Sequence, residues 1–284
     1  MWGYKHFGYF CLMQRLHRLF DFYLDASIHV AFAIVALVMA TSLLLNIPFD
    51  FHLVCFLFFG SISCYNFVKY GPEAEKYLKL TNLYHKNIQF FSIVCLLIAV
   101  DHAFFLKTET WVGIIILVLM TGLYAVPVLP RAKNLRSWSG LKIFIVAGVW
   151  AGTTVILPCL EVGQALSWDI YIETGQRFLL VLILILPFEI RDLRYDAREL
   201  QTLPQIFGVR RTKIFGLLLT AIFFIGIFLK DSIEPGELFE KGILSGMLIM
   251  ALLLAKQRQS QYFASFWVEG IPIVWVVWLW VTAK

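Results

Sequence analysis

The chain has 284 residues, of which 60% are hydrophobic, 16% aromatic and only 15% charged, and its formal net charge is +5. Soluble domains carry about 25% charged residues, so this composition excludes a soluble enzyme, a disordered chain and a nucleic-acid-binding module. The mean hydropathy of +0.77 indicates an integral membrane protein whose surplus apolar surface is solvated by membrane lipids.

Residues 1–25 mix aromatic and aliphatic side chains with Arg15, His17 and Arg18. This mixture predicts an amphipathic helix that lies at the membrane interface and is anchored to lipid headgroups. Residues 26–284 are expected to form one transmembrane domain. Its two halves show no internal repeat, which counts against a transporter built from inverted repeats.

Apolar stretches long enough to cross a bilayer recur along the whole transmembrane domain. They are residues 26–45, 52–68, 88–105, 111–129, 141–160, 171–190, 214–229, 238–255 and 266–283. In the sixth stretch the uninterrupted apolar run, Phe178–Phe188, is short. Glu173 and Arg177, four residues apart, are expected to pair and to extend toward the interface, which completes the span. The sequence therefore predicts an all-α protein with nine transmembrane helices.

The basic residues are distributed unevenly over the predicted loops. All but five of the 24 Lys and Arg residues fall on the side that carries the N-terminus. Because loops rich in Lys and Arg stay in the cytoplasm, we expect the N-terminus inside and the C-terminus outside. The protein is accordingly predicted to be a multi-pass protein of the cytoplasmic membrane.

The loop after the sixth stretch carries Glu189, Asp192, Asp196 and Glu199, which share one face if the segment stays helical. Neighbouring carboxylates repel each other by a few tenths of a kcal/mol per pair, so a cation is expected near them. Asp192 and Asp196, one turn apart, are candidates to hold Mg²⁺ against a diphosphate. An interfacial helix with its acids toward water and its arginines toward headgroups explains the same spacing.

The order of residues around this loop resembles a known family. Asp192-x-x-x-Asp196, then Gln201-Thr-Leu-Pro204, then Gly208 is similar to the second aspartate motif of the UbiA-type membrane prenyltransferases. Two further segments extend the resemblance over essentially the whole chain: Tyr124-Ala-Val-Pro127 with Arg131 and Lys133, and Tyr262-Phe263 with Glu269-Gly270. The resemblance implies nine transmembrane helices around a central lipid-facing cavity, with both aspartate motifs on the cytoplasmic side.

The resemblance also implies a function. It implies a Mg²⁺-dependent transferase that moves an isoprenyl group from a polyprenyl diphosphate to a lipophilic acceptor, with Asp192 and Asp196 as catalytic and metal-binding residues. The other candidate site residues are Asn66, Lys69, Arg131, Lys133 and Lys142 for the diphosphate, and Tyr124 for the cavity. Anchoring at the cytoplasmic face explains Arg131, Lys133 and Lys142 equally well.

The first aspartate motif, expected after the second helix, departs from the family pattern. Asn66 is kept, but Phe67, Tyr70 and Ala74 stand where aspartates are expected. Two hypotheses follow: Lys69 neutralises the diphosphate in place of a lost metal, or the protein binds a lipid or quinone without catalysis. Lys69 also fits a plain topology anchor.

Glu269 is an acid near the start of the last apolar stretch. An ionisable group inside a membrane is costly unless it faces a cavity or the interface. Its position near the cytoplasmic end predicts that Glu269 lies at the interface.

Overall fold

The computed structural model describes residues 3–70, 83–125, 139–196 and 200–282, and the side chains of 3–12, 123–125 and 139–141 are outside this description. The α-helices are α1 (Gly3–Asp25), α2 (Ile28–Leu44), α3 (Phe51–Tyr70), α5 (Leu83–Ala103), α6 (Thr108–Ala125), α7 (Ser139–Ala151), α8 (Leu157–Val162), α9 (Trp168–Asp192), α10 (Leu203–Ile225), α11 (Glu237–Leu254) and α12 (Ile271–Thr282). Two short π-helices, η3 (Gly152–Ile156) and η6 (Phe263–Val268), and the 3₁₀ turn η5 (Gly226–Leu229) complete them. The predicted all-α class is confirmed.

Six helical segments of the described chain are long and apolar enough to span a membrane. The number rises to seven if α1 and α2, which meet at a bend of 56°, are counted together as one span. The described part of α6 is shorter than a span, and α11 carries Glu237, Glu240 and Lys241 in its first turns. Each of the nine predicted stretches overlaps a described helix. The chain is therefore an integral membrane protein, while the count of nine spans stays a prediction.

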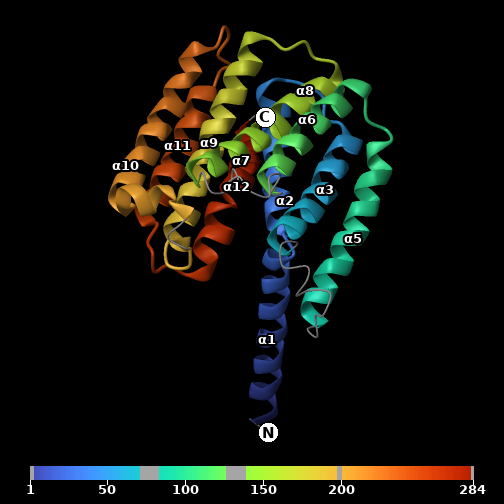
Figure 1. The fold of residues 1–284 in the computed structure, drawn as a ribbon, viewed down its shortest axis with the longest axis vertical. Helices are drawn as coiled ribbons and strands as arrows, with labels where there is room; N and C mark the ends of the chain where they lie inside the picture. The colour runs from blue at the N-terminus through green and yellow to red at the C-terminus, as the bar shows by residue number, and fades with distance from the viewer. Residues whose placement is uncertain (1–2, 71–82, 126–138, 197–199, 283–284) are drawn as a thin grey trace, which may run out of the picture.

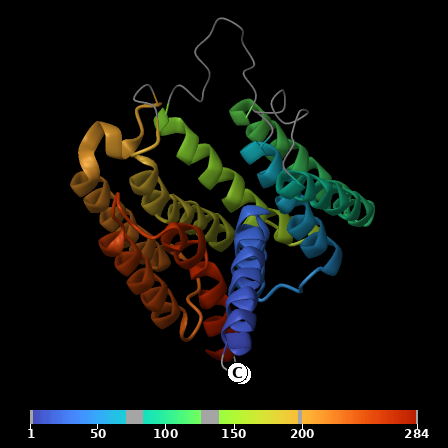
Figure 2. The same cartoon turned by 90° about the horizontal axis from the view of Figure 1, so that it is seen from below.

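Helix α2 lies between two groups of helices. This helix contacts α3 on one side and α12 on the other, and α3 pairs with α5. On the other side α9 packs against α7, α10 and α11, and α6 contacts α7. Figures 1 and 2 show α10 and α11 at one flank of the bundle and α3 and α5 at the opposite flank. The region between the two flanks contains the cavities described below.

The largest apolar core surrounds α9, whose Leu180, Leu182 and Leu186 are almost fully buried. Leu37 of α2 and Trp275 of α12 pack into the same core. Lipid chains are as apolar as leucine, so close packing and polar contacts between helices stabilise such a bundle. The core therefore fixes α9 as the central support of the functional site.

The joint between α1 and α2 is held by α3. Figure 1 shows α1 running out of the bundle away from this joint. Ser27 has a φ of 59°, which is rare for a residue other than glycine. Its hydroxyl donates to Asn66 Oδ1 at 2.7 Å, and Asn66 Nδ2 donates to the Ala26 carbonyl at 3.1 Å. Asn66 thus supports a strained backbone turn.

Both π-helices are bonded to α2 through a side chain. Thr41 Oγ1 donates to the Thr154 carbonyl of η3 at 2.7 Å, and His29 Nε2 lies 2.9 Å from the Phe266 carbonyl of η6. Because a carbonyl only accepts, His29 Nε2 carries the proton and Nδ1 accepts from the Tyr23 hydroxyl at 2.7 Å. Single-turn π-helices are often found at functional sites.

Candidate functional site

The predicted acidic stripe lies at the end of α9, but the helix stops there. α9 ends at Asp192, so the continuous helical face assumed from the sequence is interrupted, and Glu199 lies outside the described residues. The Asp196 amide nevertheless donates to the Asp192 carbonyl at 2.9 Å. This bond keeps the two aspartates one turn apart.

The two aspartates have different electrostatic surroundings. Arg191 donates from Nε and Nη2 to the two carboxylate oxygens of Asp192, at 2.7 and 3.0 Å. Burial and the negative charge of Asp192 raise the pKa of Asp196, and the positive charges of Lys142 and Arg191 lower it by less. A cation between the two carboxylates would relieve this repulsion.

The segment after the aspartates is fixed by a helix cap. Thr202 and Gln205 form a capping box at the start of α10, in which Gln205 Oε1 accepts from the Thr202 amide at 3.0 Å. Gln205 Nε2 also donates to the Asp196 carbonyl at 3.4 Å. Gly208 has a φ of 78°, a conformation that favours glycine. The residues of the family-like motif thus anchor the loop that carries Asp196.

A polar cavity of about 720 Å³ lies beside the end of α9. Side chains of α1, α3, α5, α9 and η6 contribute to its wall. Its charged residues are Arg18, Asp21, Asp25, Lys69, Arg191 and Glu269. Arg191 connects the cavity to the aspartate pair, because its guanidinium lines the cavity and bonds to Asp192.

Lys69, predicted to bind the diphosphate, lines this polar cavity but is already paired. Its Nζ lies 3.3 Å from Asp25 Oδ1 at the end of α1, and both side chains are half-exposed. Asp25 also accepts a hydrogen bond from the Tyr84 hydroxyl at 2.9 Å, and its carbonyl accepts one from Tyr70 at 3.1 Å. The Lys69 ammonium group, which is predicted to bind an anionic ligand, is therefore already paired with an acid of α1.

A second, apolar cavity of about 310 Å³ lies next to the first. One face of α3 lines it, together with residues of α2, α6, α7 and η3. Tyr65 lines both cavities, and its hydroxyl accepts a hydrogen bond from Trp150 Nε1 at 2.6 Å. The polar and apolar cavities therefore meet at Tyr65.

The structure brings together only part of the predicted site. Asp192 and Asp196 are neighbours, Lys142 acts on Asp196 through its charge, and Lys69 lines the polar cavity. Asn66 is 4% exposed and lines neither cavity, since its amide holds the α1–α2 joint. Arg131, Lys133 and the side chain of Tyr124 lie outside the described residues.

Most residues of the polar cavity were not predicted from the sequence, among them Tyr65, Arg191 and Glu269. The interfacial-helix alternative places the arginines of this segment toward headgroups, but the Arg191 guanidinium bonds to the carboxylate of neighbouring Asp192. Glu269 was expected at the interface and instead lines the polar cavity. An acid inside an apolar stretch is itself a signal of a functional site, and this signal for Glu269 is present in the sequence alone.

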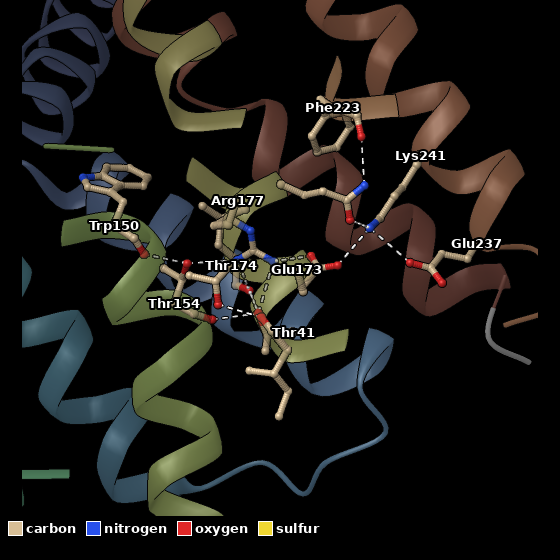
Figure 3. A network of polar contacts seen from close by, with 12 residues as sticks. Thr41, Trp150, Thr154, Glu173, Thr174, Arg177, Phe223, Glu237 and Lys241 are labelled. Atoms are coloured by element: carbon tan, nitrogen blue, oxygen red, sulfur yellow. Dashed lines mark hydrogen bonds and ion pairs between the residues drawn. The ribbon is translucent and has the colours of Figure 1, made fainter. Parts of the chain in front are cut away.

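Buried charges form a separate network among α9, α11 and Lys230, the residue after η5. Figure 3 shows the part of it that joins Glu173 of α9 to Lys241 and Glu237 of α11. Glu173 Oε2 lies 2.8 Å from Lys241 Nζ and 3.3 Å from Lys230 Nζ, and Glu237 pairs with both lysines. Burial lowers the pKa of Lys230, but the charges of Glu173 and Glu237 outweigh it, so the pKa is raised. This network joins helices that are distant in sequence.

Arg177 extends the network to α2 and η3, as Figure 3 shows. Its guanidinium donates to the Leu37 carbonyl at 2.8 Å and to Thr154 Oγ1 at 3.0 Å, and it pairs with Glu173 at 3.4 Å. The predicted pairing of Glu173 with Arg177 is confirmed, but their side chains are only 2% and 1% exposed. The expectation that they extend to the interface is wrong, because buried partners satisfy both charges.

Comparisons with known proteins identify the architecture. No protein-family model and no curated protein sequence matches this chain. A UbiA homologue from Archaeoglobus fulgidus bound to Cd²⁺ is similar, with a TM-score of 0.60 and 14% identity over 92% of this chain and 99% of that chain. The same homologue bound to GPP and Mg²⁺ gives a TM-score of 0.55 and 13% identity over the same shares.

A digeranylgeranylglyceryl phosphate synthase gives a TM-score of 0.55 and 12% identity, over 94% of this chain and 97% of that chain. At such low identity the likeness concerns the fold, and it extends over nearly the whole length of each protein. The chain therefore has the same fold as these UbiA homologue structures and the synthase.

Proposed function

We propose that this chain is a membrane prenyltransferase that moves an isoprenyl group from a polyprenyl diphosphate to a lipophilic acceptor. The observation that carries the proposal is the meeting at Tyr65 of an apolar cavity with a polar cavity whose lining includes Lys69 and Arg191 as well as three acids. A polyprenyl diphosphate has this same division between an anionic head and an apolar tail. The similar UbiA homologue binds GPP and Mg²⁺, which supports this ligand class.

The diphosphate is held at the polar cavity by Lys69 and Arg191. Arginine presents its donors as a planar fork that matches the oxygens of a phosphate, whereas lysine acts as a compact point charge. Both cations already line one cavity from two different helices, α3 and α9. In this arrangement the diphosphate displaces Asp25 from Lys69.

The aspartate pair fits a divalent cation. Carboxylate oxygens are ligands for Mg²⁺, and Asp196 has a raised pKa because a second carboxylate lies close to it. Asp192 and Asp196 would hold the ion, and the bonds from Gln205 and Arg191 fix their positions. When bound, Mg²⁺ would supply positive charge that stabilises the departing diphosphate.

The isoprenoid tail occupies the apolar cavity along α3. Leu57, Gly60, Cys64 and Val68 follow one another at helical spacing on its wall, so the tail runs parallel to this helix. Excluding water from the reacting carbon prevents its hydrolysis. The acceptor reaches the reacting carbon of the isoprenyl group from the lipid. The loops that carry the aspartate motifs face the cytoplasm.

A non-catalytic lipid- or quinone-binding protein is the second candidate function. It is favoured by the side-chain contacts at the end of α3, where Asn66 holds the α1–α2 joint and Lys69 pairs with Asp25. The apolar cavity serves this function as well. Dependence of ligand binding on Mg²⁺ separates the two candidates.

The proposal is tested by binding of geranylgeranyl diphosphate to detergent-purified protein with and without Mg²⁺. We expect Mg²⁺ to strengthen binding to the wild type and to have no effect on the double variant Asp192→Asn/Asp196→Asn. Asp101 is an exposed acid at the opposite end of the bundle, so Asp101→Asn serves as the matched control and should behave as wild type. Binding that ignores Mg²⁺ in the wild type would favour the lipid-binding protein instead.

A further inference from the structure

Glu269 occupies an unusual position in the polar cavity. It follows η6 directly and lines the cavity wall together with Lys69 and Arg191, whose positive charges act on it. Within the described part of the chain, no hydrogen bond or ion pair joins its carboxylate to another side chain. A carboxylate without a donor, facing a cavity, is available to a ligand.

The other two acids of the cavity are already engaged. Asp25 pairs with Lys69 and accepts from the Tyr84 hydroxyl, and Asp21 accepts from the Tyr262 hydroxyl at 2.8 Å. Asp192, outside the cavity wall, is bonded by Arg191. Among the described acids around this cavity, Glu269 is therefore the one whose carboxylate oxygens are not engaged by a hydrogen bond or ion pair.

The backbone around Glu269 is built to hold it there. The Glu269 amide donates to the Ala264 carbonyl at 3.1 Å, a bond that closes a π-helical turn. A Cβ on Gly270 would lie 2.7 Å from the Phe266 carbonyl and 3.3 Å from His29 Nε2, so only glycine fits beside this turn. His29 in turn bonds the Phe266 carbonyl. These contacts thus fix the backbone position of Glu269 at the cavity wall.

The proposed reaction needs such a group. The bond from C1 of the isoprenyl group to the diphosphate oxygen breaks, and its electron pair leaves with the diphosphate. A nucleophilic atom of the acceptor forms the new bond to C1 and must then lose its proton. Asp192 and Asp196, proposed to hold the cation, are not free to receive this proton.

We propose that Glu269 is the catalytic residue that receives this proton on a carboxylate oxygen, an inference that rests on the proposed function. The acceptor class follows: a lipophilic molecule whose head bears a proton that is lost on alkylation. That head lies in the polar cavity beside Glu269, and the apolar body of the acceptor lies toward lipid. A positioned general base contributes about 10²- to 10⁴-fold to a rate.

The experiment compares wild type with Glu269→Gln, Glu269→Asp and Glu269→Ala. Transfer is measured as radiolabelled geranylgeranyl groups incorporated into a total lipid extract of the source cells, and Mg²⁺-dependent binding of the diphosphate is measured in parallel. We expect Glu269→Gln to bind as wild type but to transfer at least about 100-fold more slowly. Glu269→Asp should keep part of the rate, and added formate should restore Glu269→Ala in a concentration-dependent manner.

Each outcome decides between the two proposals. Wild-type protein that binds the diphosphate without any transfer overturns the proposed function and with it the inference. Active wild type with an equally active Glu269→Gln overturns the inference alone. A slow Glu269→Ala that formate does not restore means that Glu269 has a structural role, which also overturns the inference. Glu234 is an exposed acid in the loop before α11, so Glu234→Gln is the control for loss of one carboxylate.

Discussion

At the scale of single residues, the pairing of Asp25 with Lys69 competes with any anion that binds in the polar cavity. A half-exposed pair of this kind is worth about 0.2–1 kcal/mol, which corresponds to at most about a fivefold change in affinity. We therefore expect Asp25→Asn to tighten binding of inorganic diphosphate by up to about fivefold, measured by calorimetry on the purified protein. Lys69→Gln should weaken it, and equal affinities in both variants would contradict the competition.

The raised pKa of Asp196 predicts how binding depends on pH. Only the ionised carboxylate binds a cation, and burial together with the charge of Asp192 makes protonation easier than in an ordinary aspartate. As the pH falls, the Mg²⁺-dependent part of diphosphate binding should therefore weaken at a pH above the ordinary range of aspartate. A binding titration over pH tests this, and constant binding down to that ordinary range would disprove it.

The sequence predicted some site residues and missed others for a physical reason. The spacing of Asp192 and Asp196 was sufficient because one backbone bond keeps them adjacent although α9 ends between them. Glu269 and Tyr65 become cavity residues only through the packing of helices distant in sequence. Spacing along one segment carries no information about that packing. Asn66 bonds to the α1–α2 joint because Ser27 adopts a strained backbone conformation there, and the residue types alone do not reveal that conformation.

At the scale of helices, the buried network should respond unequally to loss of its members. Its described charges are Glu173, Glu237, Arg177, Lys230 and Lys241, so cations exceed anions by one. Removing an acid leaves uncompensated buried cations, and breaking such pairs costs about 3–5 kcal/mol. We expect Glu173→Gln to lower the free energy of unfolding by this amount.

Lys241→Met should cost less than Glu173→Gln, because the four remaining charges balance. Both are measured by denaturant unfolding in one detergent, with Glu234→Gln on the exposed loop as the control. An equal or reversed order of the two variants would show that charge balance does not govern the network. Apolar periodicity predicted the helices that carry these residues, but it did not predict that Arg177 stays inside the bundle.

At the scale of the whole molecule, the uneven distribution of Lys and Arg predicts the orientation in the membrane. We expect Arg194→Cys, in the exposed turn after α9, to face the cytoplasm and Glu234→Cys to face outside. In a background without the five native cysteines, an impermeant maleimide added to intact cells should label only Glu234→Cys. Labelling of Arg194→Cys instead would invert the topology, and labelling of both would refute the uniform orientation.

The two π-helices have a consequence for how such a protein changes in evolution. A π-helical turn holds one residue more than an α-helical turn, so η3 and η6 each represent an insertion rather than a substitution. Removing one residue from 263–268 would let this turn close as an ordinary α-helix, because the wider π-helical turn already absorbs the extra residue. The same deletion inside α12 would instead rotate the flanking segments by about 100°. A single-codon deletion is therefore easier to accommodate at 152–156 and 263–268 than elsewhere in the same helices.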